Sequence, residues 1–165
     1  MIPLIFIIVS FILEGLCSLI FNSSLLATTF SFLSLLFIYP FVKEKKNFMI
    51  ISFIFGLIYD ITYTGTVLLN AFIFLVASII IIKLYKTFQM NPFNIIIISI
   101  SLIIIYRSIT YLFLLSISNQ SFNIMVLLES IYSSLILNAI YVFIIYFILT
   151  RKCFKKRIQN SKIKY

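Results

Sequence analysis

Six long apolar runs, joined by connections of only a few residues, fill almost all of the first 150 residues of this chain. A helix needs about 20 apolar residues to cross a bilayer. The chain is 63% hydrophobic and 10% charged, whereas soluble domains are about 25% charged, so an ordinary soluble domain and a disordered chain are excluded. The pattern predicts an all-α integral membrane protein with one domain over residues 1–150 and a basic cytoplasmic tail, 151–165. The expected transmembrane helices are 3–20, 24–42, 47–64, 66–82, 93–118 and 124–150.

The basic residues fall in alternate connections between these runs. Three basic residues follow the second run, two follow the fourth and seven occupy the tail. The first, third and fifth connections contain no basic residue. Because lysine and arginine stay on the cytoplasmic side of a membrane, we expect both termini to be cytoplasmic. The twelve residues are Lys43, Lys45, Lys46, Lys83, Lys86, Arg151, Lys152, Lys155, Lys156, Arg157, Lys162 and Lys164.

Four charged residues lie inside the predicted spans: Glu14, Asp60, Arg107 and Glu129. The predicted orientation places all four in the outer half of the membrane, where a charge facing lipid costs about 2.5–3.5 kcal/mol. We therefore expect Arg107 to face the interior of the bundle and to pair with one of the three acids. We interpret this charge network as structural. A proton path, a small-ligand site and a docking site for another protein's helix remain alternatives.

Small and polar residues recur at helical spacing and predict inward-facing sides of the helices. The third span carries such a stripe, and shorter ones lie on the first, fourth and sixth spans. The four stripes consist of Ser52, Gly56, Tyr59, Asp60 and Tyr63; Ser10, Glu14, Cys17 and Ser18; Asn70, Ala71, Ala77 and Ser78; and Ser130, Ser134 and Asn138.

Motifs of enzymes and metal sites are absent from the sequence. The chain has no histidine and three glycines, and it contains neither a glycine-rich phosphate loop nor a GxSxG elbow. We therefore predict no enzyme activity, no metal site and no cofactor. The net charge of +9 is explained by membrane orientation and by attraction to anionic lipids, so we predict no nucleic-acid partner.

The most specific motif lies between Gly56 and Asn70. Gly56, Leu57 and Asp60 form a Gly-Leu-x-x-Asp pattern, and Gly65 begins a turn that leads to Asn70. This segment resembles the best-marked part of the rod shape-determining protein MreD family, and the length, six spans and basic tail fit that family too. Thr66 and Val67 stand where many members have a Leu-Gly step.

The resemblance implies a non-enzymatic scaffold of the bacterial cell-elongation complex. Such a scaffold binds the single-span protein MreC and supports lateral peptidoglycan synthesis, with RodA and a class B penicillin-binding protein as further partners and MreB as an indirect one. The family fold is thought to be similar to the substrate-binding (S) subunit of energy-coupling-factor vitamin transporters, which makes such a subunit the alternative function. Against it, the chain has no tryptophan to stack on a ligand. The composition, rich in Ile, Phe, Asn and Lys, fits the cell membrane of a Gram-positive-type bacterium with an AT-rich genome.

Overall fold

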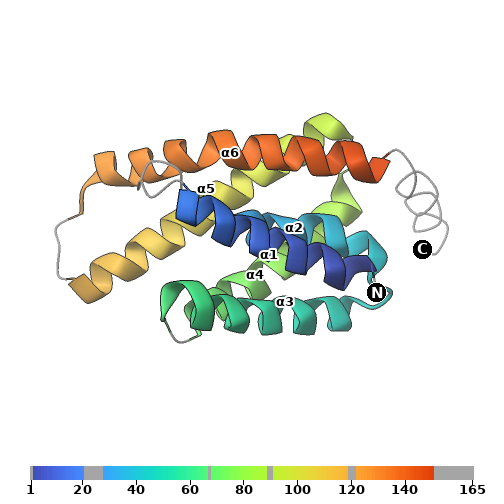
Figure 1. Ribbon diagram of the computed structural model, residues 1–165, viewed down its shortest axis with the longest axis horizontal. Helices are drawn as coiled ribbons and strands as arrows, with labels where there is room; N and C mark the ends of the chain where they lie inside the picture. The colour runs from blue at the N-terminus through green and yellow to red at the C-terminus, as the bar shows by residue number, and fades with distance from the viewer. Residues whose placement is uncertain (1, 21–27, 67, 89–90, 119–121, 151–165) are drawn as a thin grey trace.

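The computed structural model describes residues 2–20, 28–66, 68–88, 91–118 and 122–150, which form six α-helices and no strand (Figure 1). The all-α prediction is therefore confirmed. The predicted tail, 151–165, lies outside the described residues. The helices are α1 (Ile2–Ile20), α2 (Phe30–Ile38), α3 (Lys45–Tyr59), α4 (Leu69–Thr87), α5 (Pro92–Ser118) and α6 (Ile124–Thr150), with a 3-10 turn, η1, at Tyr39–Phe41 and a π-helical turn, η2, at Asp60–Thr64.

Four helical segments are long and apolar enough to cross a membrane: 45–64, 69–87, 92–117 and 124–148. The other two apolar segments, Ile5–Ile20 and Phe30–Phe41, are shorter. At 1.5 Å per residue the second of these rises only about 18 Å, less than the hydrocarbon core of about 30 Å. Membrane crossing by the first two helices therefore stays a prediction, and residues 24–27 of the second predicted span lie outside the described residues.

Two helices extend beyond the predicted spans into the predicted basic connections, because α3 begins at Lys45 and α4 ends at Thr87. α4 continues to Thr87, so Lys83 and Lys86 lie on the helix and not in a connection. Lysine is a good helix former, and a cation near a helix C-terminus interacts favourably with the helix dipole. These two effects favour the continuation of α4 past Ile82.

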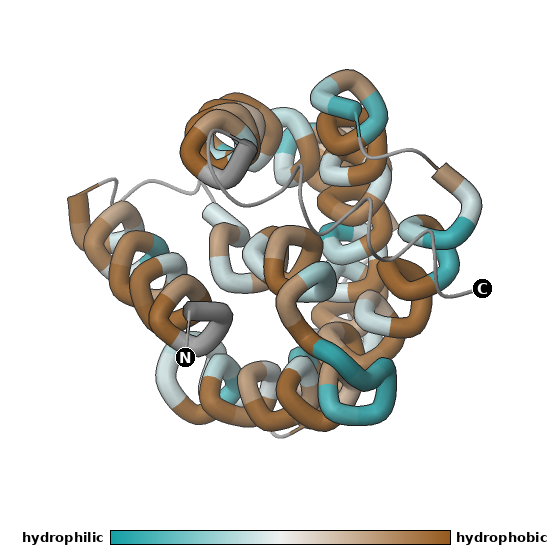
Figure 2. The backbone as a smooth tube through the Cα atoms, turned by 90° about the vertical axis from the view of Figure 1, so that its right-hand side faces the viewer, coloured by the Kyte–Doolittle hydropathy of each residue, from teal (hydrophilic) through white to brown (hydrophobic). Residues whose placement is uncertain are grey.

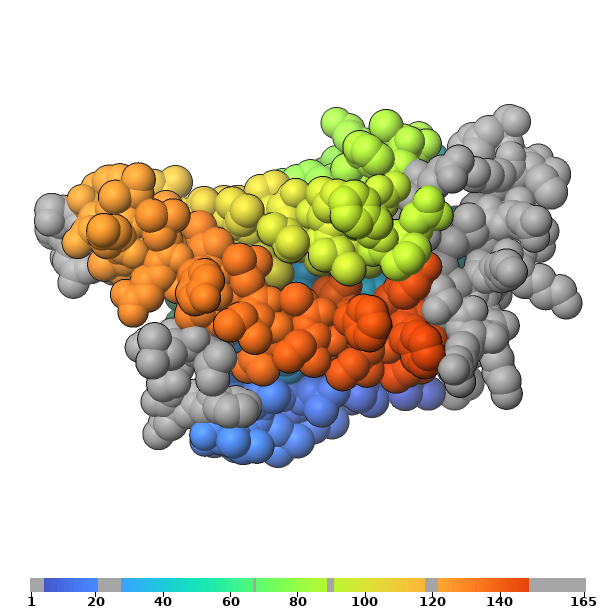
Figure 3. All heavy atoms as spheres, turned by 90° about the horizontal axis from the view of Figure 1, so that it is seen from above, coloured from blue at the N-terminus to red at the C-terminus, as the bar shows by residue number. Residues whose placement is uncertain are grey.

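α2 occupies the centre of the molecule, and the other five helices surround it. All nine of its residues are buried, which is the expected position for a helix that is apolar on every side. Figure 2 looks along the helices and shows α2 in the middle of the ring. Figure 3 shows α6 between α5 and α1 on one face, where the hydroxyls of Ser10 and Tyr141 are 2.6 Å apart.

The helices run in alternating directions, so the first residues of α1 and the last residues of α6 lie at the same end (Figure 1). α5 and α6 project beyond the others at the opposite end. No described residue of α5 after Tyr106, and none of α6 before Ser133, is buried. The buried core thus consists of α2, the first half of α5, the second half of α6 and one face of each remaining helix.

Candidate functional site

Asp60 binds the N-terminus of α4 from the end of the preceding helix. Its Oδ1 accepts hydrogen bonds from the backbone N–H (3.1 Å) and the side-chain Nδ2 (2.8 Å) of Asn70, and its Oδ2 accepts one from the backbone N–H of Ala71 (3.2 Å). The hydroxyls of Thr64 and Thr66 donate to Oδ1 as well. Asp60 is 1% exposed. The first N–H groups of a helix have no partner within it, and this carboxylate supplies the cap that the N-cap residue, Leu68, cannot.

A close approach of two helices brings Asp60 within reach of α4. A Cβ on Gly56 would lie 2.5 Å from the Cα of Ala71, so only glycine allows this packing distance. Asp60 follows Gly56 by one turn and therefore meets the first turn of α4. Gly65 ends the π-helical turn in the left-handed region at φ 61°, and Leu68 also has a positive φ of 69°. The Gly-x-x-x-Asp spacing thus has a direct geometrical reason.

Asn70 extends the contact from α4 to α5. Its Oδ1 accepts a hydrogen bond from the hydroxyl of Tyr106 (2.9 Å), while its Nδ2 donates to Asp60 and to Thr64. Asn70 and Tyr106 are both buried. Because a buried polar group must find partners, this chain of hydrogen bonds fixes α3, α4 and α5 relative to one another at one end of the bundle.

Glu14 plays a comparable part at the N-terminus of α2. Its Oε2 accepts a hydrogen bond from the backbone N–H of Ser31 (2.9 Å), and its Oε1 accepts one from the hydroxyl of Tyr59 (2.8 Å). Asn138 of α6 completes the cap, because its Oδ1 accepts from the backbone N–H of Thr29 (3.0 Å). Thr29 is itself the N-cap residue but makes no side-chain cap. Three helices, α1, α3 and α6, thus meet at the start of α2.

The other residues expected at the site, Leu57, Arg107 and Glu129, are less deeply buried than Glu14 and Asp60. Leu57 is half-buried on α3. Arg107 lies half-buried on α5 with its guanidinium carbon 5.7 Å from the centroid of the Tyr106 ring. Glu129 is exposed on α6. The structure therefore assembles Glu14, Asp60 and their hydrogen-bond partners within the bundle, with Arg107 at its edge and Glu129 on its surface.

Tyr106, which connects Asn70 to α5, is not among the residues predicted from the sequence. A tyrosine within an isoleucine-rich span carries no spacing signal of its own, and aromatic residues are common in membrane helices. The polar stripes were more informative. Among their members the structure buries Ser10, Glu14, Ser52, Gly56, Tyr59, Asp60, Asn70, Ala71, Ala77, Ser78, Ser134 and Asn138.

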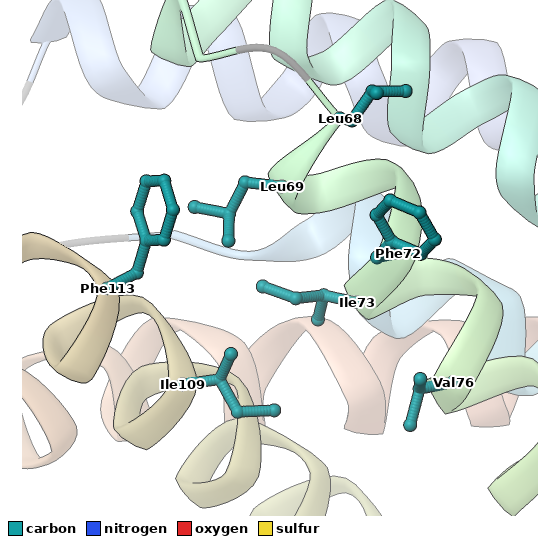
Figure 4. A pocket seen from close by; sticks show the side chains of 7 residues that line it. All are labelled: Leu68, Leu69, Phe72, Ile73, Val76, Ile109 and Phe113. Atoms are coloured by element: carbon teal, nitrogen blue, oxygen red, sulfur yellow. The ribbon is translucent and has the colours of Figure 1, made fainter. Parts of the chain in front are cut away.

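An apolar groove lies beside the Asp60 cap, between the first half of α4 and the second half of α5 (Figure 4). Its volume is about 470 Å³. Leu68 and Leu69 form its rim at the turn that Asp60 holds, so the cap fixes this part of its wall. The apolar lining suits hydrocarbon and not a polar ligand, whose groups would lose their hydrogen bonds to water. The lining residues are Leu68, Leu69, Phe72, Ile73, Val76, Ile109 and Phe113.

The fold and the site define the class as an all-helical membrane protein in which buried carboxylates cap the N-termini of two helices. The family model for the rod shape-determining protein MreD matches residues 1–155, and the chain belongs to this family. The resemblance inferred from Gly56, Leu57, Asp60 and Gly65 is thereby confirmed. MreD proteins are a structural family of the MreBCD cell-shape complex and not a known enzyme family. No curated protein and no solved structure matches the chain.

Proposed function

We propose that this protein is a multi-pass membrane scaffold of the cell-elongation complex, that it binds MreC within the membrane and that it thereby supports lateral peptidoglycan synthesis. The observation that carries the proposal, beyond family membership, is the use of the two buried carboxylates. Glu14 and Asp60 accept hydrogen bonds from backbone N–H groups at two helix N-termini. Groups engaged in this way fix the shape of the bundle, which is the property a scaffold needs.

The proposed orientation places both termini in the cytoplasm. The lysines at the start of α3 and in the last turns of α4 lie at the same end of the bundle as the start of α1 and the end of α6 (Figure 1). Lysine-rich ends remain cytoplasmic. The Asp60 cap and the projecting α5–α6 hairpin then lie toward the outer face of the cell membrane, where peptidoglycan is assembled. RodA and a class B penicillin-binding protein are proposed as further partners, and MreB as an indirect one.

Affinity purification of the tagged protein from membranes in mild detergent tests the proposal. Mass spectrometry should recover MreC together with cell-wall synthases. Photo-crosslinkers at lipid-facing positions on different helices, such as Ile54, Phe72 and Ile144, should identify the helix that contacts the MreC span. Crosslinking to MreC at one of these positions and not at the others would locate the interface.

The alternative is the substrate-binding subunit of a vitamin transporter, because its fold is expected to be similar. The same purification distinguishes the two functions. Recovery of an ATPase module or of a bound vitamin, without MreC, would contradict the scaffold proposal and favour the transporter subunit.

A further inference from the structure

Five lysines gather at one end of the α3–α4 hairpin. Figure 2 looks onto this end, and its longest hydrophilic stretch is the start of α3 at the bottom of the view. All five lysines are exposed, and Glu44 is the acidic residue of this segment. The cluster, called here the lysine end, consists of Lys43, Lys45, Lys46, Lys83 and Lys86.

Tertiary packing brings these lysines together, although about 40 positions separate the two groups in the sequence. α3 and α4 pack antiparallel, and the contact of Gly56 with Ala71 sets their register. The hydroxyl of Tyr85 donates to the backbone oxygen of Leu36 (2.7 Å), and the rings of Tyr85 and Tyr39 pack edge to face. The end of α4 is therefore held against the segment that leads into α3.

The position of Lys45 and Lys46 is not explained by helix stability. They occupy the first turn of α3, where the positive end of the helix dipole disfavours cations. Lys86, in the last turn of α4, is favourably placed. The start of α3 therefore adds its own positive potential to that of the lysines.

An apolar stripe on α3 begins next to the lysine end and continues along the helix. Lys46, Ile50 and Ile54 follow one another at intervals of four residues and so share one face of α3. Ile50 and Ile54 are each 47% exposed. On the neighbouring helix, Phe72 and Val76 are exposed as well, and the ring of Phe72 packs against Phe53 of α3. This outer face of the hairpin is thus cationic at one end and apolar along its length.

We propose that this face binds an anionic phospholipid of the cytoplasmic leaflet, with the headgroup phosphate at the lysine end and an acyl chain along Ile50 and Ile54. Charge complementarity selects an anion. The apolar stripe favours a lipid over free phosphate, because free phosphate has no acyl chain to lie along it. It also favours a lipid over an acidic protein surface, because such a surface would contact the lysines alone. The assignment to the cytoplasmic leaflet rests on the proposed orientation, whereas phospholipid binding does not require MreC.

Binding of phosphatidylglycerol to the delipidated full-length protein in uncharged detergent micelles tests the inference. The change is the double substitution Lys46→Gln and Lys83→Gln. The matched control is Lys162→Gln with Lys164→Gln, which removes the same charge from the tail. Each lysine near a membrane surface contributes a factor of about five. The first pair should therefore weaken phosphatidylglycerol binding roughly 30-fold. The control pair should weaken it much less, because Lys162 and Lys164 do not belong to the lysine end.

Three further measurements decide between the possible ligands. Phosphatidylcholine should bind far more weakly than phosphatidylglycerol. Glycerol 3-phosphate and a poly-glutamate peptide should fail to displace the bound lipid. Equal weakening by the two variant pairs, or displacement by either soluble anion, would overturn the proposal. If the Lys46/Lys83 variant does not fold, the wild-type protein still decides, because headgroup binding must weaken with rising salt and salt-independent binding would contradict it.

Discussion

The N-termini of α2 and α4 are both capped by the side chain of a buried carboxylate residue. The two caps differ in how far the capping residues lie from the helix along the sequence. At α4, Asp60 reaches groups four to eleven residues ahead of it and satisfies two backbone N–H groups, two hydroxyls and an amide. At α2, the backbone donors are divided between Glu14 and Asn138, which are more than 100 residues apart. The α4 cap is therefore a local, sequence-readable device, whereas the α2 cap exists only when several helices have assembled. We infer that the first fixes one hairpin and the second fixes the whole bundle.

Removing the α4 cap should have the largest effect. Asp60→Leu leaves the backbone N–H groups of Asn70 and Ala71 buried without partners, at about 1–3 kcal/mol each. We expect a loss of about 2–6 kcal/mol, seen as a much lower amount of protein in the membrane and a lower Tm in detergent.

Asp60→Asn is the matched control for this substitution, because it keeps one acceptor oxygen and the shape of the side chain. It should be tolerated better than Leu, with a loss of about 1–3 kcal/mol, because its amide nitrogen removes the acceptor of one backbone N–H group. Normal accumulation of the Leu variant would contradict a structural role for Asp60.

Removing Glu14 from the α2 cap should have the second largest effect on stability. Glu14→Leu leaves one backbone N–H, that of Ser31, without its acceptor, and the Tyr59 hydroxyl without its partner. We expect a loss of about 2–4 kcal/mol in the unfolding free energy, measured by thermal unfolding in micelles. Because this cap joins non-consecutive helices, protease cleavage should become faster in several connections at once.

The Asp60→Leu variant provides the comparison for that measurement. Its cleavage should increase mainly in the α3–α4 connection. Identical cleavage patterns for the two Leu variants would remove the distinction between a local and a global cap.

Gly56→Ala tests the α4 cap without changing the residues of the α2 cap. Its Cβ would meet backbone atoms of α4 at 2.5–2.8 Å, which cannot move without separating the helices. Overpacking of this kind costs about 1–3 kcal/mol, measured as the decrease in the stability of the purified protein.

Gly15→Ala on α1 is its control. The Cβ there would meet the hydroxyl of Tyr63 at 2.7 Å, and a side-chain end can shift. Its loss should be clearly smaller than that of Gly56→Ala, and the reverse order would refute the close-packing explanation.

The smallest expected effect concerns the charge of Arg107. Because Arg107 is expected to pair with one of the acids, we predict that Arg107→Leu destabilises the bundle and that adding Glu14→Gln restores part of the loss. A double-mutant cycle should give a coupling of about 1 kcal/mol. The same cycle with Asp60→Asn or Glu129→Gln should give less. Absence of coupling to all three acids would reject the pairing of Arg107 with a carboxylate.

Much of the site could be predicted because its α4 half is local. Gly56, Asp60, Gly65 and Asn70 lie within 15 residues, so their spacing already contains the geometry of a tight hairpin. The partners of Glu14 could not be predicted in this way, since a hydrogen bond to Ser31 or Tyr59 depends on which helix faces lie together. Tyr106 shows the same limit, because no local pattern marks which tyrosine in an apolar helix faces inward.

The sequence by itself determined that the chain is helical, that it is built for a membrane, and that a Gly-Leu-x-x-Asp turn belongs to the MreD family. These properties follow from composition and from residues a few positions apart. Tertiary structure alone decided that α2 is the enclosed central helix, that Glu14 caps it, that Glu129 lies on the surface, and that the lysines at the start of α3 and at the end of α4 share one end of a hairpin. In a chain where nearly every helix is apolar all round, hydrophobicity does not distinguish the core from the lipid-facing surface. The distinction comes from packing and from the few buried polar groups that must find partners.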